Sequence, residues 1–401
     1  MDDVRDEMLI GEPEKHRPVL LFVVNIAWFF ISHRLQLALA AKRKGFSVHV
    51  ATGVDDPADA SRIRNLGLVL HELPVARGTA GFLTNAAFVS AVWRTMRTIR
   101  PSVVHNVTLK PIIVGGVFAR LLRIPAVVNA VPGLGYAFSA RGWRASARRL
   151  AVRVPLSLAL RNPRSTAIFQ NPEDLAYLVR SGVVATRRCV LIRGAGVDPA
   201  QFLPAPEPEG PVTVVLISRM LRAKGVCDFV DAAQILRARK VDVRMVLVGD
   251  TDDAYGAVPR AQLEKWSASG VVSWLGHRDD VPLILAAAHI VCLPTYYGEG
   301  VPRVLIEAAS TARPIVATNV PGVREIVRDG LNGILIEPHR PDVLADAIAA
   351  LANDAARRTE MGARGRQLVI AEFDLKDVIA RTLDVYQSLL ANGRRRRGPT
   401  P

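Results

Sequence analysis

The chain has 401 residues, of which 50% are hydrophobic and 22% are charged. This length and composition predict two globular domains, or three small ones, and exclude an intrinsically disordered chain. The formal net charge of +15 predicts a negatively charged partner, a class that includes nucleic acid, anionic lipid and phosphorylated substrates.

The positive charge is concentrated in the first half of the chain. Residues 1–200 contain 27 Lys and Arg and 13 Asp and Glu, whereas residues 201–401 contain 25 and 24. The two halves therefore carry net charges of +14 and +1. We expect the first half to face the anionic partner.

No targeting or membrane-spanning segment is expected. Residues 1–17 mix charges of both signs, which is not typical of a signal peptide. The apolar run VLLFVVNIAWFFI (19–31) has 13 residues and contains Asn25, whereas a bilayer span needs about 20. We interpret this run as a buried strand followed by a turn. The three cysteines lack metal or redox spacing and predict buried thiols in a reducing compartment: Cys189, Cys227 and Cys292.

The first half alternates short apolar runs with segments of helical periodicity. Helices are expected at 33–44, 82–99 and 111–122, and at 171–182, where Asn171 is a suitable N-cap. The expected strands are PVLLFVVN (18–25), FSVHVAT (46–52), LVLHELP (68–74), SVVHNV (102–107), AVVNAV (126–131) and TAIFQ (166–170).

A Pro- and Gly-rich segment (194–211) separates this half from a second series of alternating strands and helices. Apolar strands joined by helical crossovers predict parallel sheets covered on both faces. The sequence therefore predicts an α/β fold with two doubly wound, Rossmann-like domains that face a cleft. The expected strands of the second half are VTVVLIS (212–218), VRMVLVG (243–249), VVSWLG (271–276), HIVCLP (289–294), PIVAT (314–318) and NGILIE (332–337).

The stretch YYGEGVPRVLIE (296–307) directly follows one of these strands. Pro302 fits the first turn of a helix, and free N–H groups at a helix N-terminus form an anion site. Gly298 and Gly300 allow a ligand to approach the backbone closely. A phosphate group is expected at the backbone of Val301, Pro302, Arg303 and Val304.

Two carboxylates flank that anion site. Glu299 and Glu307 would repel a phosphate, so we expect them to accept hydrogen bonds from hydroxyl groups. A nucleotide sugar, with phosphates between two hydroxyl-bearing rings, fits both features. The alternative is that both acids are ordinary charges of the first helical turn.

Two further strand ends carry candidate ligand-binding side chains. Arg219 and Lys224 lie in ISRMLRAKG (217–225), where they are suited to neutralising a diphosphate, although a plain surface loop is the alternative. His105 in VVHNVTLKP (103–111) is expected to close a strand and face the cleft, unless its role is structural. Asp250 and Asp252 have the spacing of a metal-binding pair, but we interpret them as part of a solvated loop.

The segment SARGWRASARRLAV (139–152) predicts a basic amphipathic helix, with Arg141, Arg144, Arg148 and Arg149 on one arc. Such a helix is typical of a membrane-surface contact, and also of an ordinary surface helix. His/Cys clusters, G-x-S-x-G and P-loop motifs are lacking, which disfavours metal-dependent hydrolysis, serine hydrolysis and NTPase chemistry.

The motifs GEGVPRVLIE, SRMLRAKG, GVDPAQF and PGVREIV together resemble glycosyltransferase family 4, a family of retaining enzymes with the GT-B fold. The resemblance covers nearly the whole chain. The segments WFFISHRLQLALA, HNVTLKP and GLGYAF are similar to bacterial members that extend polyprenyl-diphosphate-linked surface glycans.

This resemblance implies a UDP-sugar donor, with an N-acetylhexosamine-type sugar, and roles for the candidate residues. Glu299 would hold the hydroxyls of the donor sugar and Glu307 those of the ribose. Arg219 and Lys224 would bind the diphosphate, and His105 would approach the donor sugar. The base would contact the backbone of Gly276, His277 and Arg278.

One segment departs from the family pattern. Many members have a paired-glycine loop followed by a glutamate early in the first domain, where this chain has NIAWFFISHR (25–34). In this chain, other groups are therefore expected to make the contacts to diphosphate and acceptor that the paired-glycine loop makes in those members. Ser32, His33 and Arg34 are the candidates.

The resemblance also assigns the parts of the chain. Residues 1–196 would form an acceptor- and membrane-facing domain, 197–211 a linker, and 212–372 the nucleotide-sugar-binding domain. A helix at 373–392 would pack back on the first domain, followed by a basic tail at 393–401.

The expected enzyme needs no metal or cofactor and no nucleic acid. It works in the cytoplasm at the inner face of the cell membrane, on a polyprenyl-diphosphate-linked saccharide. The alternatives are a non-hydrolysing UDP-sugar epimerase and a non-catalytic nucleotide-binding protein. Nucleic-acid binding has charge in its favour but no motif.

Overall fold

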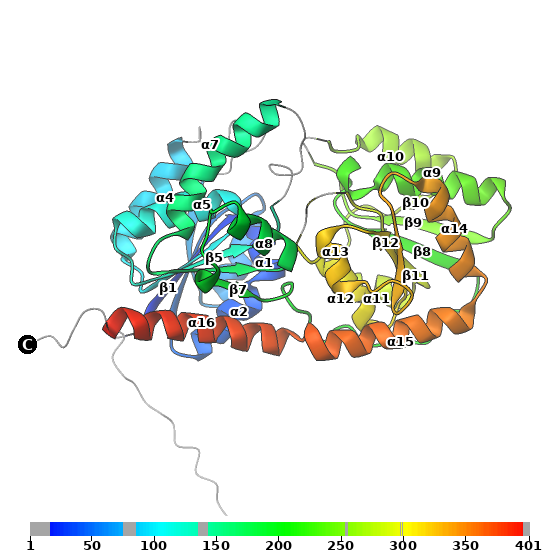
Figure 1. Ribbon diagram of the computed structural model, residues 1–401. Helices are drawn as coiled ribbons and strands as arrows, with labels where there is room; N and C mark the ends of the chain where they lie inside the picture. Colours follow the sequence, from blue (N-terminus) through cyan, green and yellow to red (C-terminus); the bar gives the residue numbers. More distant parts are fainter. Residues whose placement is uncertain are drawn as a thin grey trace, which may run out of the picture.

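The computed structural model describes residues 17–74, 86–134, 143–252, 256–296, 298 and 300–395, without the side chains of 143–151 and 393–395. Two α/β domains lie side by side, and helices α15 (Ala355–Glu372) and α16 (Leu375–Arg395) run beneath both of them (Figure 1). The predicted fold class is confirmed. Within the described ranges, no helix is both long and apolar enough to cross a membrane.

The N-terminal domain contains a parallel seven-stranded sheet in the order β3-β2-β1-β4-β5-β6-β7. Six strands lie at the predicted apolar runs, whereas the three-residue edge strand β7 was not predicted. The strands are β1 (Val19–Ile26), β2 (Ser47–Gly53), β3 (Val69–Leu73), β4 (Val103–Val107), β5 (Ala126–Val131), β6 (Ser165–Phe169) and β7 (Cys189–Leu191).

Helices connect these strands and cover both faces of the sheet, so the strands are apolar on both sides. The predicted cap of α8 is confirmed, because Asn171 Oδ1 accepts a hydrogen bond from the Asp174 amide at 2.7 Å. The helices are α1 (Ala27–His33), α2 (Leu35–Arg43), α3 (Pro57–Asn65), α4 (Ala86–Ile99), α5 (Leu109–Leu121), α7 (Trp143–Leu160) and α8 (Pro172–Arg180).

The C-terminal domain contains a parallel six-stranded sheet in the order β10-β9-β8-β11-β12-β13, with every strand at a predicted run. The strands are β8 (Val212–Ile217), β9 (Val243–Val248), β10 (Ser273–Trp274), β11 (Ile290–Leu293), β12 (Ile315–Thr318) and β13 (Gly333–Ile336). The helices before α15 are α9 (Val226–Ala238), α10 (Arg260–Ala268), α11 (Val281–Ala286), α12 (Arg303–Ser310), α13 (Pro321–Ile326) and α14 (Pro341–Ala352), and a short 3₁₀ turn covers Arg222–Lys224.

The segment 19–31 differs from its prediction, because β1 passes directly into helix α1 without a turn. No side chain caps α1, and its N-cap residue Ile26 is extended. Phe30 is instead fully buried and packs edge-on against Phe22, with ring centroids 5.6 Å apart. Tertiary packing therefore stabilises a helix that local sequence signals do not predict.

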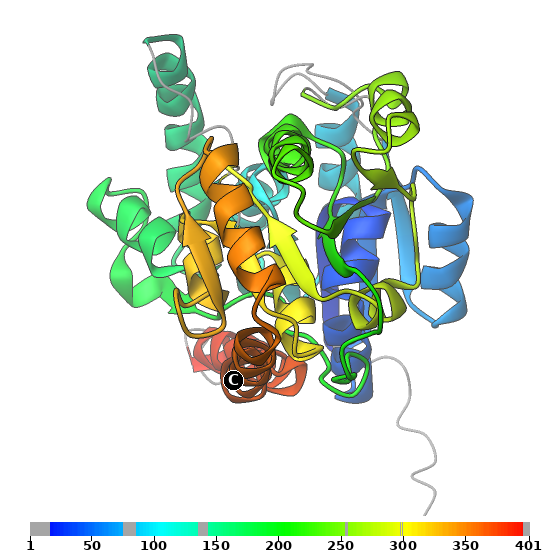
Figure 2. The same cartoon turned by 90° about the vertical axis from the view of Figure 1, so that its right-hand side faces the viewer.

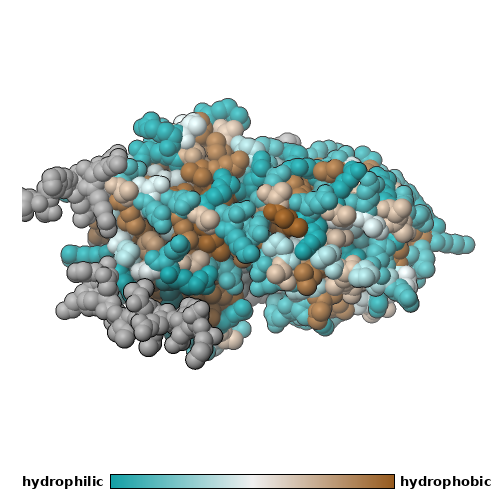
Figure 3. Space-filling view, turned by 90° about the horizontal axis from the view of Figure 1, so that it is seen from below, coloured by the Kyte–Doolittle hydropathy of each residue, from teal (hydrophilic) through white to brown (hydrophobic). Residues whose placement is uncertain are grey.

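Helices α15 and α16 join the two domains along one side of the molecule. Figure 2 looks along the molecule and shows them nearly end-on below the sheets. Their outer face is mainly hydrophilic (Figure 3), while Val378, Leu383 and Tyr386 of α16 are buried against the N-terminal domain. Helix α16 extends to Arg395, beyond the expected start of the tail, and residues 396–401 lie outside the described residues.

The two segments that cross between the domains are hydrogen bonded to each other. The Val197 amide donates to the Phe373 carbonyl at 3.1 Å, and the Leu375 amide donates to the Val197 carbonyl at 3.0 Å. Gly194 and Gly196 have φ angles of 67° and 71°, and a Cβ on Gly196 would lie 2.8 Å from the Leu375 Cα. Glycine is therefore required at this crossing.

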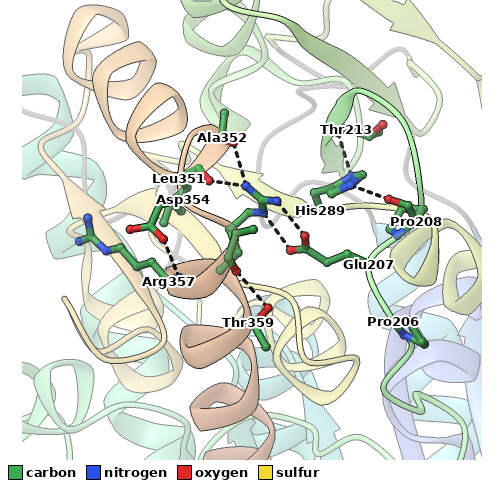
Figure 4. A network of polar contacts seen from close by, with 12 residues as sticks. Pro206, Glu207, Pro208, Thr213, His289, Leu351, Ala352, Asp354, Arg357 and Thr359 are labelled. Carbon is green, nitrogen blue, oxygen red and sulfur yellow. Dashed lines mark hydrogen bonds and ion pairs between the residues drawn. The ribbon is translucent and has the colours of Figure 1, made fainter.

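The expected linker, 197–211, is bound along the C-terminal domain. The Arg358 guanidinium, with a side-chain exposure of 6%, donates to both oxygens of Glu207 at 2.8 and 2.7 Å. Nε2 of His289 lies 3.0 Å from the Pro208 carbonyl oxygen (Figure 4). Because these groups are buried or half-buried, the segment is held as part of that domain.

Candidate functional site

Two turns of the C-terminal domain meet beyond the carboxyl ends of β8 and β11. The Ala223 carbonyl accepts hydrogen bonds from the Tyr296 amide at 3.0 Å and from the Thr295 hydroxyl at 3.1 Å. Gly225 lies so close to the Pro294 carbonyl that a Cβ would lie 2.1 Å from its oxygen. The turn that carries Lys224 is thereby fixed beside the turn that leads into α12.

Helix α1 of the N-terminal domain faces these turns. The Arg219 guanidinium lies 6.0 Å from the centre of the Trp28 ring. Burial, together with the nearby positive charges of Arg34, Arg303 and Lys224, lowers the pKa of His33 to about 3. The predicted cations Arg219 and Lys224 therefore both reach the junction between the domains, in the neighbourhood of Arg303.

The turn before α12 touches the N-terminal domain directly. A Cβ on Gly300 would lie 1.6 Å from the Pro132 carbonyl oxygen and 2.0 Å from Gln170 Oε1. The Val301 amide donates to Gln170 Oε1 at 3.2 Å. Sequence reasoning missed Pro132 and Gln170, because nothing in their local sequence identifies a partner more than a hundred residues away.

The N-terminus of α12 differs in one respect from the anion site expected at 301–304. Pro302 is the N-cap residue of α12 rather than part of its first turn, and it has no N–H group. The amides that begin the helix are those of Arg303 and Val304, which have no acceptor within it. Val301 contributes a third amide, which binds Gln170.

Of the two predicted carboxylates, Glu307 lies within the described residues. Glu307 is 8% exposed and accepts a hydrogen bond from Arg303 Nε at 2.7 Å. Burial raises the pKa of Glu307, and the Arg303 charge opposes that rise. Glu307 thus lies one turn inside α12, below the expected phosphate site. Glu299 lies outside the described residues.

The loop after β9 carries two aspartates that bind arginines. Asp250 Oδ1 accepts from Arg260 at 2.7 Å, and Asp252 lies 3.4 Å from Arg219. Arg219 and Asp252 are both nearly half exposed, so their ion pair is weak and open to exchange with a ligand. Among the described residues there is no group of three metal-ligating side chains.

His105 does not face the junction as expected. It lies within β4 rather than at its end, and its side chain is 1% exposed. Its Nδ1 lies 2.5 Å from the Tyr386 hydroxyl of α16, and its ring stacks on Phe22. This side chain therefore belongs to the packing between the sheet and α16, and its expected contact with a donor sugar stays a prediction.

The remaining candidates lie on the surface or outside the description. Gly276 has a φ of 67°, and its carbonyl accepts from the Gly249 amide at 2.7 Å. The neighbouring side chains pair locally, His277 with Asp279 and Arg278 with Asp280. Of the expected basic helix 139–152, residues 139–142 and the side chains that follow to 151 lie outside the described part.

Comparisons with known proteins identify both domains. Residues 211–354 match the family model "Glycosyl transferases group 1", and residues 19–160 match "Glycosyl transferase 4-like". Together the two matches cover more than two thirds of the chain.

Two relatives and one solved structure illustrate the similarity. Alpha-maltose-1-phosphate synthase of Mycobacterium tuberculosis (strain CDC 1551 / Oshkosh) is 28% identical over 72% of this chain and 80% of its own. N,N'-diacetylbacillosaminyl-diphospho-undecaprenol alpha-1,3-N-acetylgalactosaminyltransferase of Campylobacter jejuni is 23% identical over 90% and 99%. The crystal structure of Anabaena HepE in complex with UDP and glucose aligns with a TM-score of 0.74 and 20% identity, over 93% of this chain and 100% of that one, which shows the fold.

Substitution of Gly300 by alanine tests the contact between the domains. The added Cβ would collide with the Pro132 carbonyl, which is backbone and cannot move aside, so we expect the domains to be forced apart. Thermal unfolding should shift to lower temperature by at least about 2 °C, because a loss of about 1 kcal/mol has that effect in a protein of this size. Gly365→Ala in α15 is the matched control, because its Cβ meets neighbours only at 3.4 Å or more. Equal behaviour of the two variants would contradict the contact.

His33 makes the stability of the fold sensitive to acid. Its folded pKa of about 3 lies below the ordinary value of 6.5, so the unfolded chain takes up a proton first as the pH falls. The stabilisation is present above pH 6.5 and is lost towards pH 3. We expect His33→Gln to reduce the loss of stability by up to about 1.4 kcal/mol per pH unit in that range.

Unfolding curves at pH 7 and pH 5 measure this effect. His277→Gln is the control, because its side chain is 70% exposed. Equal losses of stability in wild type and His33→Gln between the two pH values would contradict the role of His33 in acid sensitivity.

Proposed function

We propose that this hexosyltransferase moves a sugar from a UDP-sugar to a lipid-linked glycan and retains the anomeric configuration. The chain belongs to the GT-B glycosyltransferases, with a 4-like domain and a group 1 domain. The observation that carries the proposal is the convergence of Arg219, Lys224 and the N-terminus of α12 at the junction of the domains. The same three elements suit the diphosphate of a nucleotide sugar.

The cations act on the leaving group. Negative charge grows on the diphosphate as the bond to the sugar breaks, and fixed positive groups placed there stabilise the transition state by several kcal/mol. Arg219 leaves its exposed partner Asp252 to bind a phosphate oxygen, while Lys224 and the amides of Arg303 and Val304 bind the others. These groups supply the charge that a metal ion supplies in other transferases, so the proposed reaction proceeds without one.

The carboxylates orient the two rings of the donor. Glu307, held by Arg303, accepts from the ribose hydroxyls, and Glu299 accepts from the sugar hydroxyls. The backbone of Gly276 to Arg278 contacts the base. No nucleophilic side chain is assigned, so the acceptor attacks from the face that the leaving group departs from, and a phosphate oxygen takes its proton.

The acceptor follows from the relatives and from charge. The Campylobacter jejuni relative is named for a polyprenyl-diphosphate acceptor and for transfer of N-acetylgalactosamine. The positive N-terminal domain of this chain suits such an anionic lipid, and an N-acetylhexosamine-type sugar in surface polysaccharide synthesis is the corresponding substrate. The epimerase and the non-catalytic protein lose support, because the matched family and the relatives named here are transferases or synthases.

The N-terminal domain would hold the enzyme at the inner face of the cell membrane. Val154 and Leu158 of α7 are 60% and 47% exposed, and Leu121 at the end of α5 is 64% exposed. Arg153 and Arg161 lie beside them and donate to carbonyls at the end of α8. Exposed apolar side chains among arginines suit an interface with anionic lipid headgroups.

Transfer from radiolabelled UDP-sugars to polyprenyl-diphosphate acceptors tests the function. We expect product only when donor and acceptor are both present, with activity retained in EDTA. Lys224→Ala should reduce kcat by about 10²-fold or more, because a charge that stabilises the leaving group is lost. Lys265→Ala, exposed on α10, is the matched control. Full transfer by Lys224→Ala, or a free epimerised UDP-sugar without acceptor, would contradict the proposal.

Vesicle flotation tests the membrane contact. We expect the protein to float with vesicles that contain anionic phospholipid, and not with phosphatidylcholine alone. Val154→Ser with Leu158→Ser should weaken flotation severalfold and leave transfer to a water-soluble acceptor unchanged. Leu283→Ser, at an exposed position of α11 in the other domain, is the control. Flotation that does not depend on lipid charge would contradict the proposed contact with anionic lipid.

A further inference from the structure

A small, partly enclosed cavity lies where the N-terminal sheet, the crossing segments and α16 meet. Its volume is about 20 Å³, and its charged or titratable lining side chains are His33, Arg34 and His105. Gln170 and Thr382 add polar groups, and most of the other lining residues are apolar. A volume of this size admits about one water molecule or one small ion, and excludes a diphosphate.

Arg34 brings a positive charge to this cavity without a matching negative one. Its side chain is 7% exposed, its Nη1 donates to the His33 carbonyl at 3.2 Å, and its Nε has no hydrogen-bond partner. Among the described residues, no carboxylate pairs with Arg34 or lines the cavity. Burial lowers the pKa of Arg34 to about 10, which still leaves it protonated at neutral pH.

Nε2 of His105 is a second buried polar atom without a partner among the described residues. Tyr386 is a neutral phenol, because burial raises its pKa, so its hydroxyl is able to donate to Nδ1 of His105. The Nε2 atom then carries the ring proton, and it has no partner within the described part of the chain. Burial and the Arg34 charge both lower the pKa of His105, and the two side chains line the same cavity.

We propose that this cavity binds a small monovalent inorganic anion such as chloride, held by the Nε–H of Arg34 and the Nε2–H of His105. A buried, uncompensated guanidinium is costly, and an anion removes that cost while accepting from both donors. A water molecule also accepts from them but leaves the charge unbalanced. The anion would hold α16 and the crossing segment at Gly194 against the N-terminal sheet, independently of any glycosyl transfer.

Bromide replaces chloride in such sites and scatters anomalously, so crystals of the full chain soaked in bromide test the assignment. We expect one strong anomalous peak in the cavity, within hydrogen-bonding distance of Arg34 and His105. Density for water alone, without an anomalous peak, would overturn the proposal.

Thermal unfolding tests the site in solution. The unfolding midpoint of the wild type should rise more in sodium chloride than in sodium gluconate at equal ionic strength, because only the folded state binds the anion. Arg34→Met should abolish the difference, whereas Arg97→Met, at an exposed position of α4, should keep it. If Arg34→Met does not fold, His105→Phe serves as the second variant. A bromide peak without a chloride-specific shift would mean binding at crystal concentration only and would refute the site.

Discussion

The hydrogen bonds to the Ala223 carbonyl are the contacts on which the candidate site depends. They fix the turn after β8 against the turn after β11, so that Lys224 lies beside the residues that enter α12. Strand ends in a parallel sheet converge at one edge by topology alone. The closeness of these two turns, however, needs the specific bonds from Thr295 and Tyr296. Without them, a cation and a helix N-terminus would lie at the same edge but would not act on one ligand.

Neither domain forms the site alone. The C-terminal domain supplies the cations and the amides, and the N-terminal domain supplies Gln170, Pro132 and the ring of Trp28. Gln170 accepts from the Val301 amide, which lies two residues before the Arg303 amide of the proposed diphosphate site. Binding of the donor and contact between the domains therefore involve the same turn of the chain, and this couples the two events.

The sequence was most informative where local signals decide the structure. The strands of both sheets follow from runs of Val, Ile and Leu, and the capped start of α8 follows from Asn171. Helix α1 was missed because it has no cap and its apolar residues resemble a strand, so that only packing of Phe30 on Phe22 reveals it. Strand β7 was missed because three residues at a sheet edge leave no periodic pattern.

The candidate site likewise contains residues that local sequence signals identify and residues that only tertiary structure brings together. Arg219 and Lys224 were found because cations after a strand end are visible in the sequence. The environment of His105 was not predicted, because its partner Tyr386 is 281 residues away and lies on a helix that returns to the first domain. Gln170 was not found for the same reason. Contacts between distant segments follow from tertiary structure, and a single sequence does not display them.

The binding of 197–211 along the C-terminal domain determines how the two halves of the enzyme move. A free tether of that length would let them drift apart in many directions. Because Arg358 holds Glu207 and the crossing segments are hydrogen bonded at Val197, residues 197–211 move with the C-terminal domain. A displacement of one domain relative to the other would therefore have to bend the chain at the two short crossings, at Gly194 to Val197 and at Phe373 to Leu375, and not along a free tether.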